Sequence, residues 1–186
     1  MLHDANLLLD FPAEFHGTFD IVNVRLLVTT IAGDDWRLVA KNLVSLLKPG
    51  GWLQWQEPDG LRSITISAED NGARKSGLQA FIDEASGDSA VHDRLDYPSS
   101  QLEGILHEAG LHSVVQDVVS SDKQPYLRYN AAIVFLQDLS GIIGSTISGE
   151  KAGQEEIHNH LRECMDDLES GAYQRYNLLC FTGMKV

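Results

Sequence analysis

Basic side chains and cysteine are both scarce in this chain of 186 residues. Its 14 lysines and arginines stand against 27 aspartates and glutamates, which gives a formal net charge of −13. A surface of this sign repels the phosphate backbone, so we expect no nucleic-acid partner. The two cysteines, Cys164 and Cys180, form no metal-binding or redox motif, and this fits a reducing compartment.

Long hydrophobic runs are also missing. The most apolar stretch, residues 21–32, is interrupted by Asn23 and Arg25 and is too short to cross a bilayer. The start of the chain lacks the basic region and the apolar run of a signal peptide. We therefore expect a cytoplasmic protein that does not bind a membrane.

Enough apolar residues remain for a folded core, since they make up 43% of the chain. This composition and length favour one domain over residues 1–186. Residues 20–25 are typical of a buried parallel strand, and the following segment places Trp36, Val39 and Leu43 on one face of a helix. Gly50 lies where a helix end often needs a positive φ, and a second strand begins just after it. Strand, helix and strand in this order predict a parallel crossover unit.

The rest of the chain predicts a loop, helices and strands. Ser100 and Glu103 match a capping box, which indicates that a helix begins there. The other expected elements are a loop at 58–77, a short helix at 78–85, a strand at 111–119, an amphipathic helix around 157–168 and a last strand at 173–186.

The run from Phe19 to Asp59 reads FDIVNVRLLVTTIAGDDWRLVAKNLVSLLKPGGWLQWQEPD. It resembles the fourth strand, the following helix and the fifth strand of class I S-adenosylmethionine-dependent methyltransferases. Its FD-V-VRLL and LKPGGWLQW-E-D patterns are similar to the fungal small-molecule branch, and the ending FTGMKV resembles the family's antiparallel final strand. The resemblance implies a truncated Rossmann-like α/β fold, with a mostly parallel sheet, an antiparallel last strand and a helical insertion at 122–149 over the substrate pocket.

The first half of that family has no counterpart here, because eighteen residues precede Phe19. No glycine-rich loop of the GxGxxG type follows any expected strand. We therefore expect no cofactor, and S-adenosylmethionine only if the missing half is supplied. In the family a short acidic turn contacts the adenine, and a loose alignment places Asp4 there; a frayed surface acid is the alternative.

Ligands of parallel α/β sheets bind beyond the carboxyl ends of the strands. Here those ends carry Asn23 and Arg25 after the first strand, and Gln56 and Glu57 after the second. Arg25 offers a permanent charge that can polarise a carbonyl or hold a carboxylate. The alternative is that Arg25 forms an ion pair with a nearby acid, for example Glu57, that staples the top of the sheet.

Aromatic residues complete the predicted pocket. Tyr97, Tyr126 and Tyr129 fall in segments that cover the pocket in the resembling family, and His92 is expected in a loop that could reach it. The predicted catalytic donors are Arg25, Tyr126, Tyr129 and His92, and the predicted substrate contacts are Asn23, Gln56, Glu57, Trp55 and Tyr97. The seven histidines do not cluster at ligand spacing, so we expect no metal.

Three functions remain open from the sequence. The favoured one is a non-methylating cyclase or pericyclase of secondary metabolism that shapes a hydrophobic polyketide- or terpenoid-like substrate, because such chemistry needs a pocket and donors but no motif. The second is a methyltransferase fragment that needs a partner or its missing half. The third is a non-catalytic partner subunit.

Without its first three strands, the expected sheet leaves the strand at 20–25 as an open apolar edge, and such edges aggregate unless they are covered. We expect a homodimer that covers the edge or the sheet face beside it. The alternative is that residues 4–11 fold back as a substitute edge strand.

Overall fold

The computed structural model describes the chain except residues 1–5, 29, 32, 61–63, 67–76, 88, 147–150 and 176. The chain divides into two compact units. The first unit comprises residues 1–58, 97–118 and 178–186, and the second comprises residues 59–96 and 119–177. The predicted insertion at 122–149 lies inside the second unit, which is larger than that segment.

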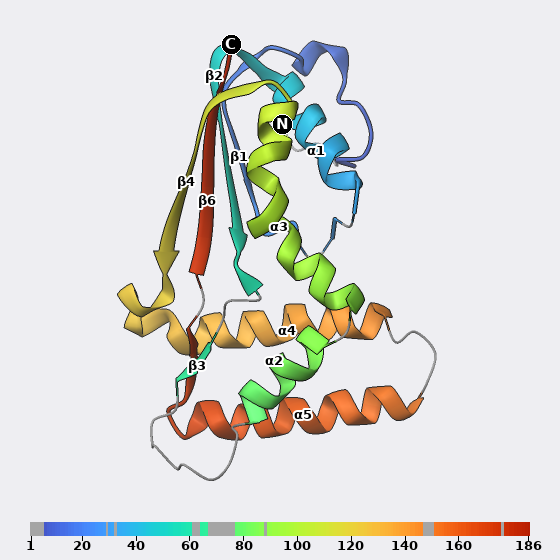
Figure 1. Ribbon diagram of the computed structural model, residues 1–186, viewed down its shortest axis with the longest axis vertical. Helices are drawn as coiled ribbons and strands as arrows, with labels where there is room; N and C mark the ends of the chain where they lie inside the picture. Colours follow the sequence, from blue (N-terminus) through green and yellow to red (C-terminus); the bar gives the residue numbers. More distant parts are fainter. Residues whose placement is uncertain are drawn as a thin grey trace. The chain divides into compact units, whose positions relative to one another are not determined.

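A four-stranded sheet in the order β1-β2-β6-β4 forms the first unit. β1 (Phe19–Arg25) is parallel to β2 (Leu47–Pro58), and β6 (Asn177–Lys185) is antiparallel to β2. β4 (Leu111–Ser120) points the same way as β2 (Figure 1). This mixed α/β sheet with an antiparallel last strand confirms the predicted fold class.

Two helices cover one face of this sheet. α1 (Asp35–Leu46) joins β1 to β2, and α3 (Ser89–Glu108) leads to β4. Figure 1 shows α1 and the first-unit part of α3 on the same side of the strands. The core between them contains large, fully buried side chains from both layers: Trp36, Leu53, Trp55, Leu102, Leu106 and Phe181. Burial of this apolar surface is the main term that stabilises the unit.

The first part of β2 depends on two glycines. Gly50 has φ +80°, a conformation that side chains rarely adopt, so the predicted positive φ is confirmed. It does not end the helix, however, because α1 ends at Leu46 and β2 begins at Leu47. A Cβ on Gly51 would lie 3.0 Å from the carbonyl oxygen of Phe19, so glycine lets β1 and β2 approach closely.

The second unit is helical with a small ribbon. β3 (Ile64–Ile66) pairs antiparallel with β5 (Tyr173–Arg175). Its other elements are α2 (Gly77–Gly87), the first residues of α3, the short turns Ser121–Lys123 and Pro125–Leu127, α4 (Arg128–Thr146) and α5 (Lys151–Glu169). The start of α2 lies against α5, because the amide of Leu78 donates to Asp167 Oδ2 at 2.9 Å.

Three expectations for individual elements are wrong. Ser100 does not begin a helix, because α3 starts at Ser89 and continues through Pro98; the buried Val91, Leu95 and Leu102 extend its apolar stripe past the proline. The expected loop at 58–77 contains β3. The expected last strand is divided between β5 and β6, which belong to different sheets.

The chain start forms no edge strand among its described residues. Residues 6–11 are turns and coil, and the carbonyls of Leu7 and Leu9 accept hydrogen bonds from Asn42 of α1 at 2.9 and 3.1 Å. This buried asparagine holds the segment on the helix. Among the described residues β1 therefore remains the edge of the sheet, and the fold-back alternative fails for residues 6–11.

Candidate functional site

A buried glutamate occupies the carboxyl end of the two parallel strands. Glu57, near the end of β2, has no exposed surface. Its carboxylate accepts hydrogen bonds from the amides of Leu27 at 2.8 Å and Val28 at 3.1 Å, and from the indole Nε1 of Trp55 at 2.6 Å. Successive backbone amides around a left-handed residue form a cradle for anions, and Leu26, with φ 59°, is that residue. Glu57 therefore fixes the loop that follows β1.

Two opposing effects act on the protonation of Glu57. Burial raises its pKa above the ordinary value of 4.5, because a charged carboxylate is costly away from water. The three donors favour the charged form and lower the pKa, but burial is the larger effect. Within the described residues, the hydrogen bonds of the Glu57 carboxyl group are to the backbone of the loop after β1 and to Trp55. We therefore assign it the role of holding that loop in place.

Three stacked aromatic rings lie behind the glutamate. The ring of Trp36 on α1 stacks on Trp55 of β2 with centroids 5.5 Å apart, and on Tyr97 of α3 at 5.7 Å. Trp36 and Trp55 are fully buried, and Tyr97 is half-buried. The structure thus places two predicted substrate contacts, Trp55 and Tyr97, in one packed stack that supports Glu57.

The backbone donors at this edge do not fit a cofactor. The amides of Leu27 and Val28 already donate to Glu57, and the amide of Leu26 donates to the carbonyl of Gln56 at 2.9 Å. A bound S-adenosylmethionine carboxylate or ribose would need free donors there. The amides of Leu26, Leu27 and Val28 are therefore not available to a cofactor. Asp4, the predicted adenine contact, lies outside the described residues.

The other predicted polar residues of the first unit lie on the uncovered face of the sheet. Asn23 donates to Gln54 Oε1 at 2.6 Å, and Gln56 lies opposite Cys180, with its Nε2 3.9 Å from the sulfur. Arg25 is exposed at the end of β1. Among the described residues no hydrogen bond or ion pair joins Arg25 to Glu57, so the alternative of a stapling ion pair is not seen.

The remaining predicted donors belong to the second unit and are exposed. Tyr126 is 77% and Tyr129 46% exposed. His92, on α3 rather than in a loop, is an exposed neighbour of Asp93 at 3.7 Å. These three residues belong to the second unit, whereas Arg25 belongs to the first.

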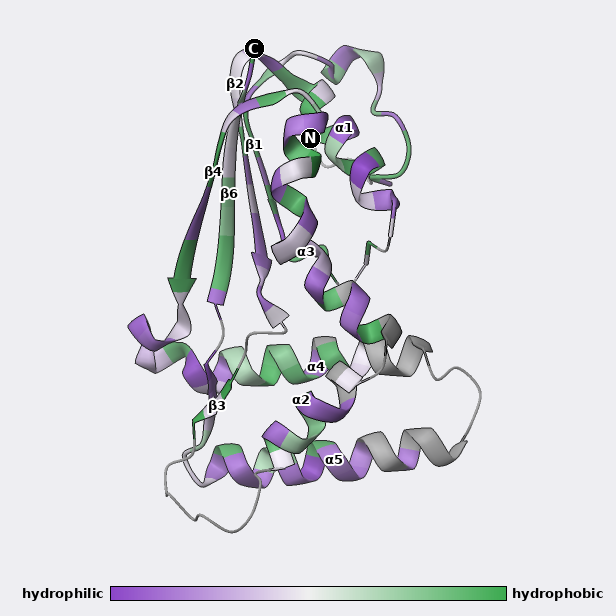
Figure 2. Cartoon of the chain, viewed as in Figure 1, coloured by the Kyte–Doolittle hydropathy of each residue, from purple (hydrophilic) through white to green (hydrophobic). Residues whose placement is uncertain are grey.

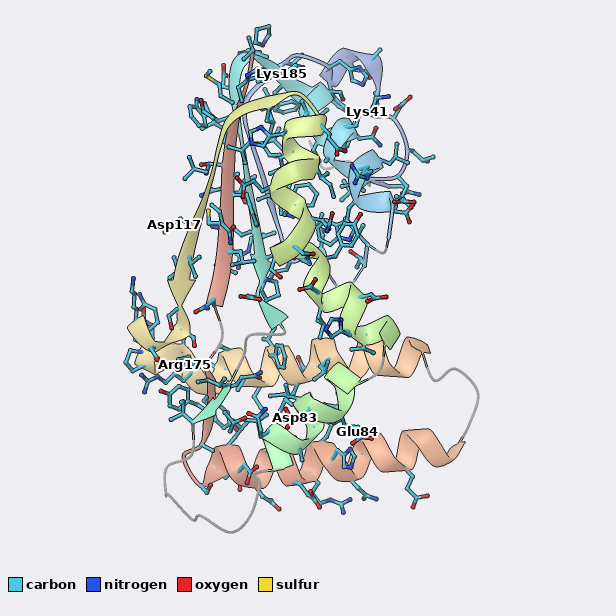
Figure 3. The ribbon with its side chains drawn as sticks, viewed as in Figure 1. Lys41, Asp83, Glu84, Asp117, Arg175 and Lys185 are labelled. Atoms are coloured by element: carbon cyan, nitrogen blue, oxygen red, sulfur yellow. The ribbon has the colours of Figure 1, made fainter. Side chains whose placement is uncertain are left out.

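The second unit contains a charged cluster that sequence reasoning missed. Asp122 accepts hydrogen bonds from the Tyr173 hydroxyl at 2.9 Å and from Arg175 Nη1 at 3.3 Å. The guanidinium of Arg128 lies 4.2 Å from the centroid of the Tyr173 ring. The hydrogen bond to Asp122 raises the pKa of the Tyr173 phenol, so it stays a neutral donor. Figure 3 labels Arg175 on β5. These residues lie far apart in the sequence and match no motif, so no local signal could have found them.

The described residues contain neither a metal-ligand cluster nor a membrane-spanning helix. No group of histidine, cysteine or acidic side chains there is arranged to hold a metal ion. No described helix combines the length and apolar character needed to span a bilayer.

Three curated fungal methyltransferases are similar to parts of this chain. Methyltransferase grgD of a Penicillium species is 46% identical over 55 residues, which are 30% of this chain and 19% of that protein. Methyltransferase psoC of Aspergillus fumigatus is 31% identical over 104 residues, covering 56% and 35% of the two chains. N-methyltransferase verN of Clonostachys rogersoniana is 39% identical over 54 residues, covering 29% and 19%.

The predicted resemblance to part of a fungal methyltransferase is thus confirmed, and the matches span about a fifth to a third of the relatives' lengths. No protein-family model matches the chain. Among solved structures, Haemonchus contortus phosphoethanolamine N-methyltransferase 2 gives a TM-score of 0.40 at 12% identity, covering 91% of this chain and 34% of that one. The [4+2]-cyclase SpnF gives 0.43 at 16%, covering 97% and 55%. Structural similarity this low does not indicate which reaction the chain catalyses.

Proposed function

We propose that this chain is the C-terminal part of a methyltransferase that acts on a hydrophobic small molecule of fungal secondary metabolism. The observation that carries the proposal is the 46% identity to methyltransferase grgD over 55 residues. The two other curated relatives are also methyltransferases, one of them an N-methyltransferase. Methyl transfer here needs a cofactor cradle from residues other than Leu26, Leu27 and Val28, because their amides are already engaged.

Reconstitution tests this proposal. We expect calorimetry to detect no S-adenosylmethionine binding to the chain alone. A mixture with the N-terminal part of grgD, ending before the segment that matches this chain, is expected to bind the cofactor with micromolar affinity. The matched control is the same grgD segment without this chain. Circular dichroism checks that both parts are folded. If they are folded and the mixture still does not bind S-adenosylmethionine, the result counts against methyl transfer.

A non-methylating cyclase is the second candidate. It is favoured by the engaged amides of Leu26, Leu27 and Val28 at the end of β1. Its donors would be Arg25, Tyr126, Tyr129 and His92, which belong to different units. In this reading, extracts that supply the natural hydrophobic substrate are converted without S-adenosylmethionine, and Arg25→Ala reduces turnover. Unchanged turnover in Arg25→Ala removes Arg25 from this candidate.

A non-catalytic partner subunit is the remaining outcome of the same experiments. It predicts that the chain stabilises a complete methyltransferase on mixing while it contributes neither cofactor binding nor turnover. Thermal unfolding of a full-length relative with and without this chain distinguishes it from the two enzymatic readings.

A further inference from the structure

One face of the sheet in the first unit has no helical layer among the described residues (Figure 1). The strand register places its side chains in three rows across β1, β2 and β6. The first row is apolar, with Ile21 68% and Trp52 44% exposed. From the first row to the last, the rows are Ile21, Trp52 and Met184; Asn23, Gln54 and Thr182; and Arg25, Gln56 and Cys180. We call these nine residues, together with Val115 and Asp117 of β4, the bare face.

β4 adds two residues to this face. Gly183 is buried on the covered face, where a Cβ on it would meet Cγ2 of Val114 at 3.1 Å. Since side chains alternate along a strand, Val115 and Asp117 point to the other side. Both are exposed, Val115 by 58%. Figure 3 shows Asp117 beside β4 on the side away from α1.

The charges of the bare face are few and opposite. The chain carries a net charge of −13, which opposes contact between two copies over most of the surface. The bare face has one cation, Arg25 on the edge strand β1, and one anion, Asp117 on the edge strand β4. Both lie toward the carboxyl ends of strands that point the same way. The hydropathy colouring of Figure 2 shows both hydrophobic and hydrophilic segments along the strands between these edges.

We infer that the bare face is a self-complementary interface that binds a second copy of this chain. A two-fold axis parallel to the strands, between β2 and β6, reverses the strand order of the partner. β1 then lies over the partner's β4, and β2 lies over the partner's β6. Two sheets packed face to face in this aligned way are separated by about 10 Å.

This arrangement matches the side chains row by row. Trp52 lies opposite the partner's Met184, a pair in which a thioether contacts an aromatic ring. Gln54 lies opposite the partner's Thr182, so two uncharged polar groups meet. Arg25 lies over the partner's Asp117, and the symmetry gives this ion pair twice. The interface also buries one face of the strand at 20–25, because Ile21, Asn23 and Arg25 belong to it.

Charge reversal tests the inference through the mass of the protein. Light scattering over a micromolar concentration series is expected to give a dimer for the unaltered chain. Arg25→Asp alone and Asp117→Arg alone each place like charges together at two points, and each is expected to weaken dimerisation about tenfold. The double variant exchanges the two charges and is expected to restore the dimer to within about threefold, which damage to the fold would not do.

Two further variants test the centre of the interface. Trp52→Glu places a carboxylate in the apolar row and is expected to give a monomer with unchanged circular dichroism. Leu38→Glu on α1 is the matched control, because Leu38 is 41% exposed outside the bare face and its variant should still dimerise.

The following results would overturn the inference. They are a monomer at every concentration, growth beyond two copies, a dimer that survives Trp52→Glu, and no rescue by the double variant. A monomer that instead binds the N-terminal part of grgD assigns the face to another occupant. That last result leaves the proposed methyl transfer intact, so failure of the dimer and failure of the function are distinguishable.

Discussion

Trp52 and Trp55 lie three residues apart on β2, yet their surroundings are opposite. Trp55 is fully buried, stacked on Trp36 and hydrogen-bonded to Glu57, whereas Trp52 is 44% exposed on the bare face. The same alternation separates Val22 from Ile21 on β1, with exposed fractions of 8% and 68%. Both faces carry apolar residues, but only one has helices packed on it in the described chain.

The two faces contribute to different properties, one to the stability of a single copy and the other to association between copies. Residues of the covered face stabilise the fold of a single copy, because their burial is complete without a partner. Residues of the bare face add little until something covers them. Variants on the two faces should therefore separate unfolding from self-association.

The largest contrast should come from the two tryptophans. Trp55→Ala removes a fully buried ring and the indole donor to Glu57, so we expect a loss of about 3–5 kcal/mol in the free energy of unfolding. Trp52→Ala should cost less than about 1 kcal/mol in dilute, monomeric protein. Urea denaturation measures both, and equal losses would erase the distinction between the faces.

The two cysteines should differ next. Burial, with Asp167 and Glu163 nearby, raises the pKa of Cys164 to about 12, so its reactive thiolate is rare at neutral pH. Cys180 is half-buried on the bare face. We expect a thiol reagent at about pH 8 to label Cys180 at least about a hundredfold faster than Cys164. Mass spectrometry of the labelled peptides checks this, and faster labelling of Cys164 would contradict its burial.

Dimerisation should also change the labelling rates of the two cysteines in different ways. If the bare face is covered by a second copy, labelling of Cys180 slows as the protein concentration rises, while labelling of Cys164 does not change. The Trp52→Glu variant should remove this concentration dependence.

A variant of Glu57 measures how much its buried hydrogen bonds stabilise the fold. Glu57→Gln replaces an acceptor of three hydrogen bonds by a group that satisfies fewer, and we expect a loss of about 1–3 kcal/mol. The raised pKa also fixes a pH dependence. The folded chain holds this proton more tightly than the unfolded chain, so the contribution of Glu57 to stability falls as pH rises from its ordinary value of 4.5 through its folded-state pKa.

The unaltered chain and Glu57→Gln should therefore differ less in free energy of unfolding as the pH rises from 4.5 through the folded-state pKa of Glu57. Urea titrations at a series of pH values measure it. A difference that widens over this range would mean that the three donors outweigh burial and that the pKa is lowered.

The smallest effect should come from the bare face. Asn23→Ala removes an exposed hydrogen bond to Gln54, so the free energy of unfolding should fall by less than about 1 kcal/mol. Urea denaturation beside the Trp55→Ala variant checks the order. A loss as large as that of Trp55→Ala would show that the bare face is a core of the single copy.

The sequence predicted the crossover unit well because its signals are local. The apolar spacing of α1 and the Leu47–Gly51 turn each depend on neighbouring residues. The capping box at Ser100 misled because the apolar stripe from Val91 to Leu102 continues through Pro98 and outweighs the local signal. The division of the last strand was also beyond local reasoning, since it depends on pairing with β3 and β2.

The sequence predicted some residues of the candidate site but not the contacts between them. Glu57 was identified from its place after a parallel strand, but not its partners, because the amides of Leu27 and Val28 reach it only through the left-handed turn at Leu26. The Asp122 cluster joins residues about fifty positions apart, Asp122 with Tyr173 and Arg175, and left no trace in the sequence.

The sequence alone determined the strand–helix–strand unit and the resemblance to fungal methyltransferases, because alternation, helical periodicity and the LKPGGWLQW run are local properties. Only the tertiary structure decided which of two apolar faces is covered. It also decided that the amides after β1 bind Glu57 rather than a ligand, and that Arg25 shares a face with Asp117. The physical reason is that burial and pairing depend on contacts between distant segments, which alternation permits on either face of a strand.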